Sequence, residues 1–136
     1  MGMPLLKNET LEEIDELLAE LRKRALDGVP IIVEGTDDVE ALKNLGVEGK
    51  FHKISSGKSL LNFIECFSGS KEAIILTDFD RTGDRLAKFS AKHLKRLGVE
   101  PVVEIRGKLK SLVHKDIKDI EGLVKFLQNQ RAMLRG

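Results

Sequence analysis

The stretch Ala73-Ile74-Ile75-Leu76-Thr77-Asp78-Phe79-Asp80 decides the fold, because a short apolar run ends abruptly in two aspartates. A continuous apolar run of this length predicts a strand that is buried on both faces of a sheet. A helical pattern follows from about Thr82 to Leu97 and ends at Gly98. A strand followed by a helix is typical of parallel sheets with crossover helices.

The same order recurs on both sides of this stretch. Residues 30–33 predict another buried strand, and Thr36 begins the helix after it. Residues 51–54 and 101–105 predict two further strands, and an amphipathic helix over residues 10–27 precedes them all. The sequence therefore predicts an α/β fold, a three-layer sandwich with a mainly parallel central sheet of about four strands flanked by helices.

The length of 136 residues fits one domain. We expect residues 1–136 to fold as a single domain, with its core at about 29–105 and an N-terminal helix at about 10–27. A basic loop and a last helix are expected over about 106–130, with the loop covering residues 106–115.

Composition excludes several classes of protein. No apolar run reaches the roughly 18 residues that a membrane span needs. The first residues lack the basic start and apolar stretch of a signal peptide, so a cytoplasmic protein is expected. The one cysteine, Cys66, excludes an internal disulfide and a cysteine-based zinc site, and its apolar neighbours predict a buried position.

The net charge of +1 hides an asymmetry between the two parts of the chain. Residues 1–80 contain 9 Lys and Arg against 16 Asp and Glu, whereas residues 81–136 contain 14 against 6. Such a difference can indicate a basic face for a polyanion, although a well-solvated surface is the more common explanation of a charge run.

Acidic residues stand where the two clearest strands end. Glu34 follows the first, and Asp78 and Asp80 follow the third. Ligands of open parallel sheets bind beyond the carboxyl ends of the strands, so these three acids converge if the strands are neighbours. Clustered carboxylates repel one another and need a cation to stay ionised. Because hard oxygen ligands suit Mg²⁺, Mn²⁺ or Ca²⁺, we predict a site for one of these divalent cations at Glu34, Asp78 and Asp80.

Each acid also has an ordinary interpretation. Glu34 could cap the next helix or pair with a lysine, and Asp80 could cap the helix that follows it. Asp78 could be a loop aspartate, and Asp84 suits the positive start of a helix. Their joint position at strand ends favours the metal site. The alternative is that the acids have structural roles only and bind no metal.

The segment Gly57-Lys58-Ser59 is similar to the end of a phosphate-binding loop. His52 stands where that motif needs its first glycine, so a nucleotide-hydrolysing loop of this type is excluded. Lys58 could still contact a phosphate from the start of the next helix.

The segments at residues 31–38 and 76–84 resemble the two motifs of the Toprim family. Their shared pattern is a strand ending in Glu-Gly and a later strand ending in Asp-x-Asp, followed here by Gly83. Bacterial primases, type IA and type II topoisomerases, recombination mediators and several nucleases share this domain. The resemblance covers about residues 29–105 and is strongest to small stand-alone Toprim proteins and to the ribosomal-RNA maturation nucleases.

The resemblance implies roles for the acids. Glu34 would act as a general acid or base or as a metal ligand, and Asp78 and Asp80 would hold Mg²⁺. Asp84 would be a secondary catalytic acid, although many members carry glutamate there. The pair Asp37-Asp38 would support the site through water.

The resemblance also implies a nucleic-acid partner, RNA or DNA. Candidate phosphate contacts are Lys58, Arg81, Arg85, Lys108 and Lys110. We predict a metal-dependent enzyme that acts on phosphodiesters, as a nuclease or in a related phosphoryl transfer. The alternative is a non-catalytic module that binds metal and phosphate and partners a larger nucleic-acid assembly. The chain has no tyrosine for covalent strand passage, and the first helix leaves a homodimer open.

Overall fold

The computed structural model describes residues 7–54 and 59–135 and arranges them as four strands and six helices. In chain order these are α1 (Asn8–Leu26), β1 (Ile31–Val33), α2 (Thr36–Asn44), β2 (Phe51–Lys53), α3 (Leu60–Glu65), β3 (Glu72–Ile75), α4 (Arg81–Arg96), β4 (Glu100–Val102), α5 (Glu104–Leu112) and α6 (Ile120–Arg135). Lys58, one of the predicted phosphate contacts, lies outside the described residues.

The sheet has the strand order β2-β1-β3-β4, and every neighbouring pair is parallel. β1 and β3 are the two central strands, with Ile31 opposite Ile74 and Ile32 opposite Ile75. Their carboxyl ends therefore lie side by side at one edge. The predicted parallel sheet of four strands is confirmed. The two strands followed by the predicted metal ligands, β1 and β3, are neighbours in it.

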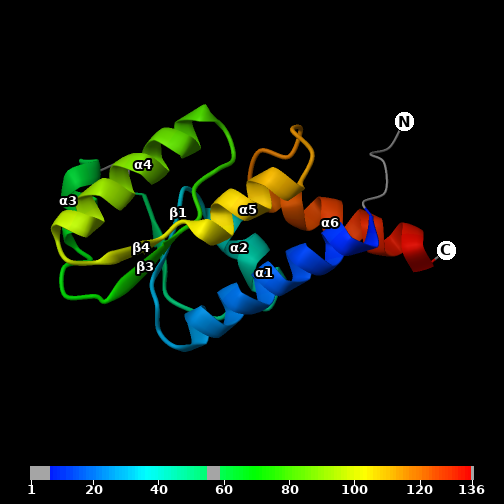
Figure 1. Cartoon of the computed structure of the whole chain (residues 1–136), viewed down its shortest axis with the longest axis horizontal. Coiled ribbons are helices and arrows are strands. Elements are labelled where there is room, and N and C mark those ends of the chain that lie inside the picture. Colours follow the sequence, from blue (N-terminus) through cyan, green and yellow to red (C-terminus); the bar gives the residue numbers. More distant parts are fainter. Residues whose placement is uncertain (1–6, 55–58, 136) are drawn as a thin grey trace.

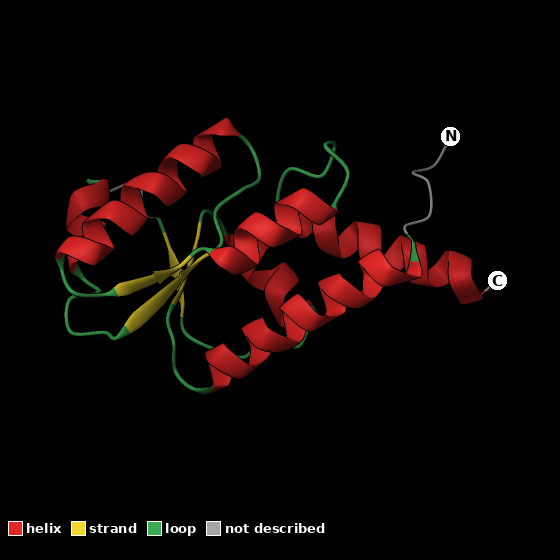
Figure 2. Cartoon of the chain, viewed as in Figure 1, coloured by secondary structure: helices red, strands yellow, loops and turns green. Residues whose placement is uncertain are grey.

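Helices cover both faces of this sheet, as the predicted three-layer sandwich requires (Figure 1 and Figure 2). The larger core joins β1 and β3 to α1, α2, α5 and α6, and the smaller one joins them to α3 and α4. Ile31 and Val33 face the larger core, whereas Ile32 faces the smaller one. This alternation along an extended strand explains why β1 is apolar at every position.

The apolar face of α1 is used inside the chain. Its buried residues belong to the larger core, and they are Ile14, Leu17, Leu18, Leu21 and Ala25. The apolar face of α1, on which the possibility of a homodimer was based, is therefore buried within the chain. Among the described helices, none combines the length and the apolar character that crossing a membrane requires.

The predicted basic loop over residues 106–115 is wrong up to residue 112, because α5 occupies Glu104–Leu112. Residues 113–115 lie outside helices and strands, as predicted. The last predicted strand is correspondingly shorter and ends at Val102. Ile105 and Leu109 are spaced one turn apart and enter the larger core, which stabilises a helix despite Gly107 in its middle. The expected burial of Cys66 is also wrong, since this residue is exposed where α3 ends.

The turn between β3 and α4 places the acids of the central edge. Asp80 is the N-cap of α4, and its Oδ1 accepts a hydrogen bond from the Gly83 amide at 2.7 Å. The Thr77 hydroxyl donates to the Gly83 carbonyl, also at 2.7 Å. A Cβ on Gly83 would overlap the Asp78 carbonyl oxygen. The turn therefore brings helix and loop so close that residue 83 must be glycine.

We predict that Gly83→Ala lowers the free energy of unfolding by about 2 kcal/mol or more, because the added methyl group forces the turn apart. Urea denaturation measures this loss. Gly107→Ala is the matched control, since a Cβ there meets no atom within 4 Å and alanine favours a helix by up to about 1 kcal/mol. Equal stability of the Gly83→Ala variant and the parent would contradict the close packing of this turn.

Candidate metal centre

Three aspartates from distant parts of the chain meet at the central edge of the sheet. Asp38, Asp78 and Asp119 each place one carboxylate oxygen within 4.8 Å of the other two. Asp38 lies in the first turn of α2, Asp78 follows β3, and Asp119 immediately precedes α6. Two of these aspartates come from the Toprim-like motifs, and the third comes from the C-terminal segment.

Asp78 is the centre of this group. Its Oδ1 is buried and has no hydrogen-bond partner among the described residues. Burial, followed by repulsion from Glu34, Asp38, Asp119 and Asp80, raises the pKa of Asp78 to about 7. A buried carboxylate oxygen without a donor is costly, and a bound cation would supply the missing partner.

Asp38 is nearly inaccessible, with 6% of its surface exposed. Its Oδ2 accepts a hydrogen bond from the Gly35 amide at 3.2 Å, and the Glu121 amide also donates to its carboxylate. Burial outweighs these bonds and, with repulsion from Asp119 and Glu34, raises the pKa of Asp38 to about 6. Asp38, which we expected to support the site through water, lies within the acidic group itself.

The C-terminal segment closes over this centre. The Phe79 amide donates to the Lys118 carbonyl at 2.6 Å, which ties the turn after β3 to the segment before α6. Asp119 Oδ1 accepts from the Gly122 amide at 2.7 Å and so caps the start of α6. The start of α6 and the turn after β3 are therefore held together by main-chain contacts that bring Asp119 to Asp78.

Glu34 and Asp80, the other two predicted ligands, are close to the centre but already have backbone partners. Glu34 Oε2 accepts a hydrogen bond from the Asp78 amide at 2.6 Å, and Asp80 Oδ1 accepts from the Gly83 amide. Both carboxylates raise the pKa of Asp78, which shows that their charges act on it. One oxygen of each therefore fixes the loop that carries Asp78.

Asp84 faces away from this group, toward α5. Its Oδ1 lies 2.7 Å from Arg106 Nη2, and its Oδ2 lies 2.7 Å from Lys110 Nζ. These bonds hold the pKa of Asp84 below its usual value. An acid that stays ionised in two ion pairs is poorly suited to give up a proton, so the contacts speak against the predicted catalytic role of Asp84.

Arg106 joins α5 to the metal-site loop. Its buried guanidinium donates through Nε to the Thr77 carbonyl at 3.0 Å and through Nη2 to the Asp78 carbonyl and the Asp84 carboxylate. The planar fork of arginine suits this simultaneous contact with several acceptors. Arg106 therefore fixes the backbone on which the Asp78 carboxylate is mounted.

The predicted phosphate contacts do not form one group. Arg81 and Arg85 are exposed on the first turns of α4, next to the acidic centre. Lys110 is engaged by Asp84. Lys108 lines a hollow with the acids Glu20 and Glu100, beside α1 and the start of β4.

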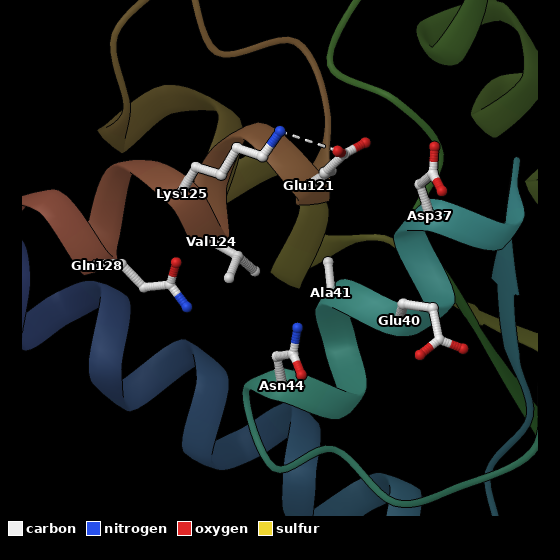
Figure 3. Close-up of a pocket in the computed structure, with 8 residues that line it drawn as sticks. All are labelled: Asp37, Glu40, Ala41, Asn44, Glu121, Val124, Lys125 and Gln128. Atoms are coloured by element: carbon white, nitrogen blue, oxygen red, sulfur yellow. Dashed lines mark ion pairs between the residues drawn. The ribbon is translucent and has the colours of Figure 1, made fainter.

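A shallow hollow of about 210 Å³ lies between α2 and α6, beside the acidic centre (Figure 3). Asp37 and Glu121 line it, and Lys125 forms an ion pair with Glu121 at 3.1 Å. Its volume is below the roughly 300–1,000 Å³ of most small-molecule sites. The space next to the acids therefore does not favour an enclosed small substrate.

Asp119 and Arg106 are the two site residues that the sequence did not reveal. The only local signal for Asp119 is an aspartate three residues before Gly122, which predicts a helix cap as readily as a ligand. Arg106 followed a supposed strand and stood in a basic run, where arginine is normally a solvated surface residue. Both roles depend on how α5 and α6 pack against the sheet.

Comparison with known proteins identifies the family of this chain. A family model described as Toprim domain matches residues 29–106. A UPF0292 protein of Methanosarcina barkeri is 43% identical over 89% of this chain and 85% of its own length. A UPF0292 protein of Methanocaldococcus jannaschii is 37% identical over 91% and 97%. A solved structure of a protein from Aquifex aeolicus is 28% identical, with a TM-score of 0.65, and the match covers 79% of this chain and 94% of that one. The chain belongs to the Toprim family.

Proposed function

We propose that this protein binds Mg²⁺ through Asp78, with Asp38 and Asp119 beside it, and acts with that ion on nucleic-acid phosphodiesters. The Toprim domain is a metal-binding fold that acts on nucleic acids. One observation supports the proposal for this chain. The Oδ1 of Asp78 is buried without a hydrogen-bond partner among the described residues, and it lies beside Asp38 and Asp119 from two other parts of the chain.

The donor set fits a hard divalent cation. The group contains carboxylates only, without the histidine or cysteine ligands that favour zinc. Mg²⁺ typically takes one or two protein carboxylates and keeps water on its other positions, which leaves room for a phosphate oxygen. Mn²⁺ accepts the same oxygen ligands and would substitute.

The bound ion would polarise a phosphodiester and offset the charge that develops on it during cleavage. Glu34 and Arg106 hold the Asp78 loop from either side, through its amide and its carbonyl respectively. Glu34 has no ion-pair partner among the described residues, so it is the acid we assign to proton transfer. We assign Asp84 to anchoring Arg106 and Lys110 instead.

Isothermal titration calorimetry with Mg²⁺ tests the ligand set. We expect Asp78→Asn to abolish binding and Asp119→Asn to weaken it about tenfold, which corresponds to about 1.4 kcal/mol. Both helix caps survive this series, because asparagine caps as well as aspartate. Asp37→Asn is the control, since Asp37 is exposed and outside the group. If Asp80→Asn removed binding while Asp119→Asn left it unchanged, the ligands would be those predicted from the sequence instead.

The pH dependence of stability tests the raised pKa values of Asp38 and Asp78. In the folded chain these carboxyls hold protons up to about pH 6 and 7, whereas the unfolded chain releases them near pH 3.8. Their protonation therefore stabilises the metal-free protein below about pH 4, and this stabilisation is lost as the pH rises through 6 and 7.

We expect thermal melting in EDTA to show this loss between pH 5 and 8 and expect Asp78→Asn to reduce it. Added Mg²⁺ should raise the melting temperature more at pH 8 than at pH 5, because protons compete with the ion. An equal gain from Mg²⁺ at both pH values would argue against binding at these two carboxyls.

Cleavage is tested with labelled single- and double-stranded RNA and DNA in Mg²⁺ or Mn²⁺. The proposal predicts products with at least one substrate, and it predicts that Glu34→Gln and Asp78→Asn lose the activity. Calorimetry on the same preparations shows whether the ion is bound. If the ion and nucleic acid both bind and no substrate is cut, the protein is the non-catalytic module, and the enzymatic part of the proposal is wrong.

A further inference from the structure

One face of α4 carries a row of four positive side chains, Arg81, Arg85, Lys88 and Lys92. Their spacing of four, three and four residues places them on one side of a helix, over a length of about 16 Å. All four are exposed, and none forms an ion pair or hydrogen bond with a described residue. The charges of this row therefore make no ion pair that stabilises the described part of the fold.

No acid of α4 neutralises the row. Asp84 is the one acidic residue of this helix, and its carboxylate is held by Arg106 and Lys110 of α5. The side chains of α4 that turn inward, among them Ala87 and Leu94, pack in the smaller core. The row is thus the solvent face of a helix whose opposite face is fixed against the sheet.

The row begins at the acidic centre. α4 starts at Arg81, directly after the turn that carries Asp78 and Asp80. From there the helix leads away from the centre along the outer side of the sheet (Figure 1). A polyanion lying on the row would therefore have one phosphate near the ion and others along α4.

The start of α1 has the opposite charge. α1 belongs to the larger core, on the face of the sheet away from α4, and its exposed residues include Glu9, Glu12, Glu13 and Glu16. The positive row attracts a polyanion to α4, and these acids repel one from the start of α1.

The aromatic residues indicate which form of nucleic acid fits. Proteins that bind single strands usually stack bases on exposed aromatic side chains. This chain has no Trp or Tyr, and its six Phe residues are buried or half-buried. Contacts from the row would reach phosphates but not bases, which suits a duplex whose bases are already paired and stacked.

We propose that the row on α4 is a track for the phosphate backbone of a nucleic-acid duplex, bound without regard to sequence and leading into the acidic centre. This inference rests on the proposed nucleic-acid function and adds the surface and the form of the substrate. Lys110 and Lys108 lie outside the track, because Asp84 engages the first and acidic residues surround the second.

The test measures binding of the full chain to fluorescent duplex DNA, duplex RNA and single strands in EDTA, between about 50 and 200 mM salt. The variant Arg85→Gln/Lys88→Gln/Lys92→Gln removes three charges and keeps good helix formers. Lys23→Gln/Lys50→Gln/Lys71→Gln is the control, because it removes the same charge from exposed positions outside α4.

We expect the α4 variant to bind duplex at least tenfold more weakly than the parent and to lower the slope of log affinity against log salt by about 2 to 3. The control should stay within about twofold of the parent. Equal losses in both variants, or no loss in the α4 variant, would overturn the track while leaving the proposed function in place. Tighter binding of single strands would overturn the choice of duplex. Absence of duplex binding by the parent would overturn the track, while the cleavage assay in Mg²⁺ tests the proposed function separately. The DNA and RNA arms show which duplex is preferred.

Discussion

The loop between β3 and α4 is held through its backbone, and this constraint shapes the rest of the site. The Asp78 amide donates to Glu34, and the Asp78 carbonyl accepts from Arg106 and lies against Gly83. The contacts that fix this residue therefore involve its main chain, while its carboxylate oxygen Oδ1 has no donor in the part of the chain that the structure describes. A rigid loop thus presents an unsatisfied charge at the edge of the sheet where Asp38 and Asp119 also arrive.

The clustered carboxylates that form the binding site also destabilise the metal-free protein. Burial and mutual repulsion raise the pKa values of Asp38 and Asp78, so the folded protein holds these carboxylates at a free-energy cost near neutral pH. A cation would relieve that cost and would bind the folded chain much better than the unfolded one. Arg106 does not form an ion pair with the Asp78 carboxylate. Its guanidinium contacts Asp84 and two carbonyl oxygens instead, so it does not offset the repulsion between Asp38 and Asp78 through such a pair.

Local patterns predicted the central part of this picture. Buried strands and the acids that end them indicated that Glu34, Asp78 and Asp80 would share one edge, and the pairing of β1 with β3 places them there. Long-range packing decided what the patterns could not. Asp119 reaches the centre only because the segment before α6 docks on Phe79, and α5 is helical because Ile105 and Leu109 enter the core on either side of Gly107.

The most direct test of the account is the position of a bound ion. Crystals of the full chain soaked in MnCl₂ and measured at the manganese absorption edge would reveal it by anomalous scattering. The account predicts a peak in contact with Asp78 Oδ1, between the carboxylates of Asp38 and Asp119. A peak held by Glu34 and Asp80 away from Asp119, or no peak at this edge of the sheet, would contradict it.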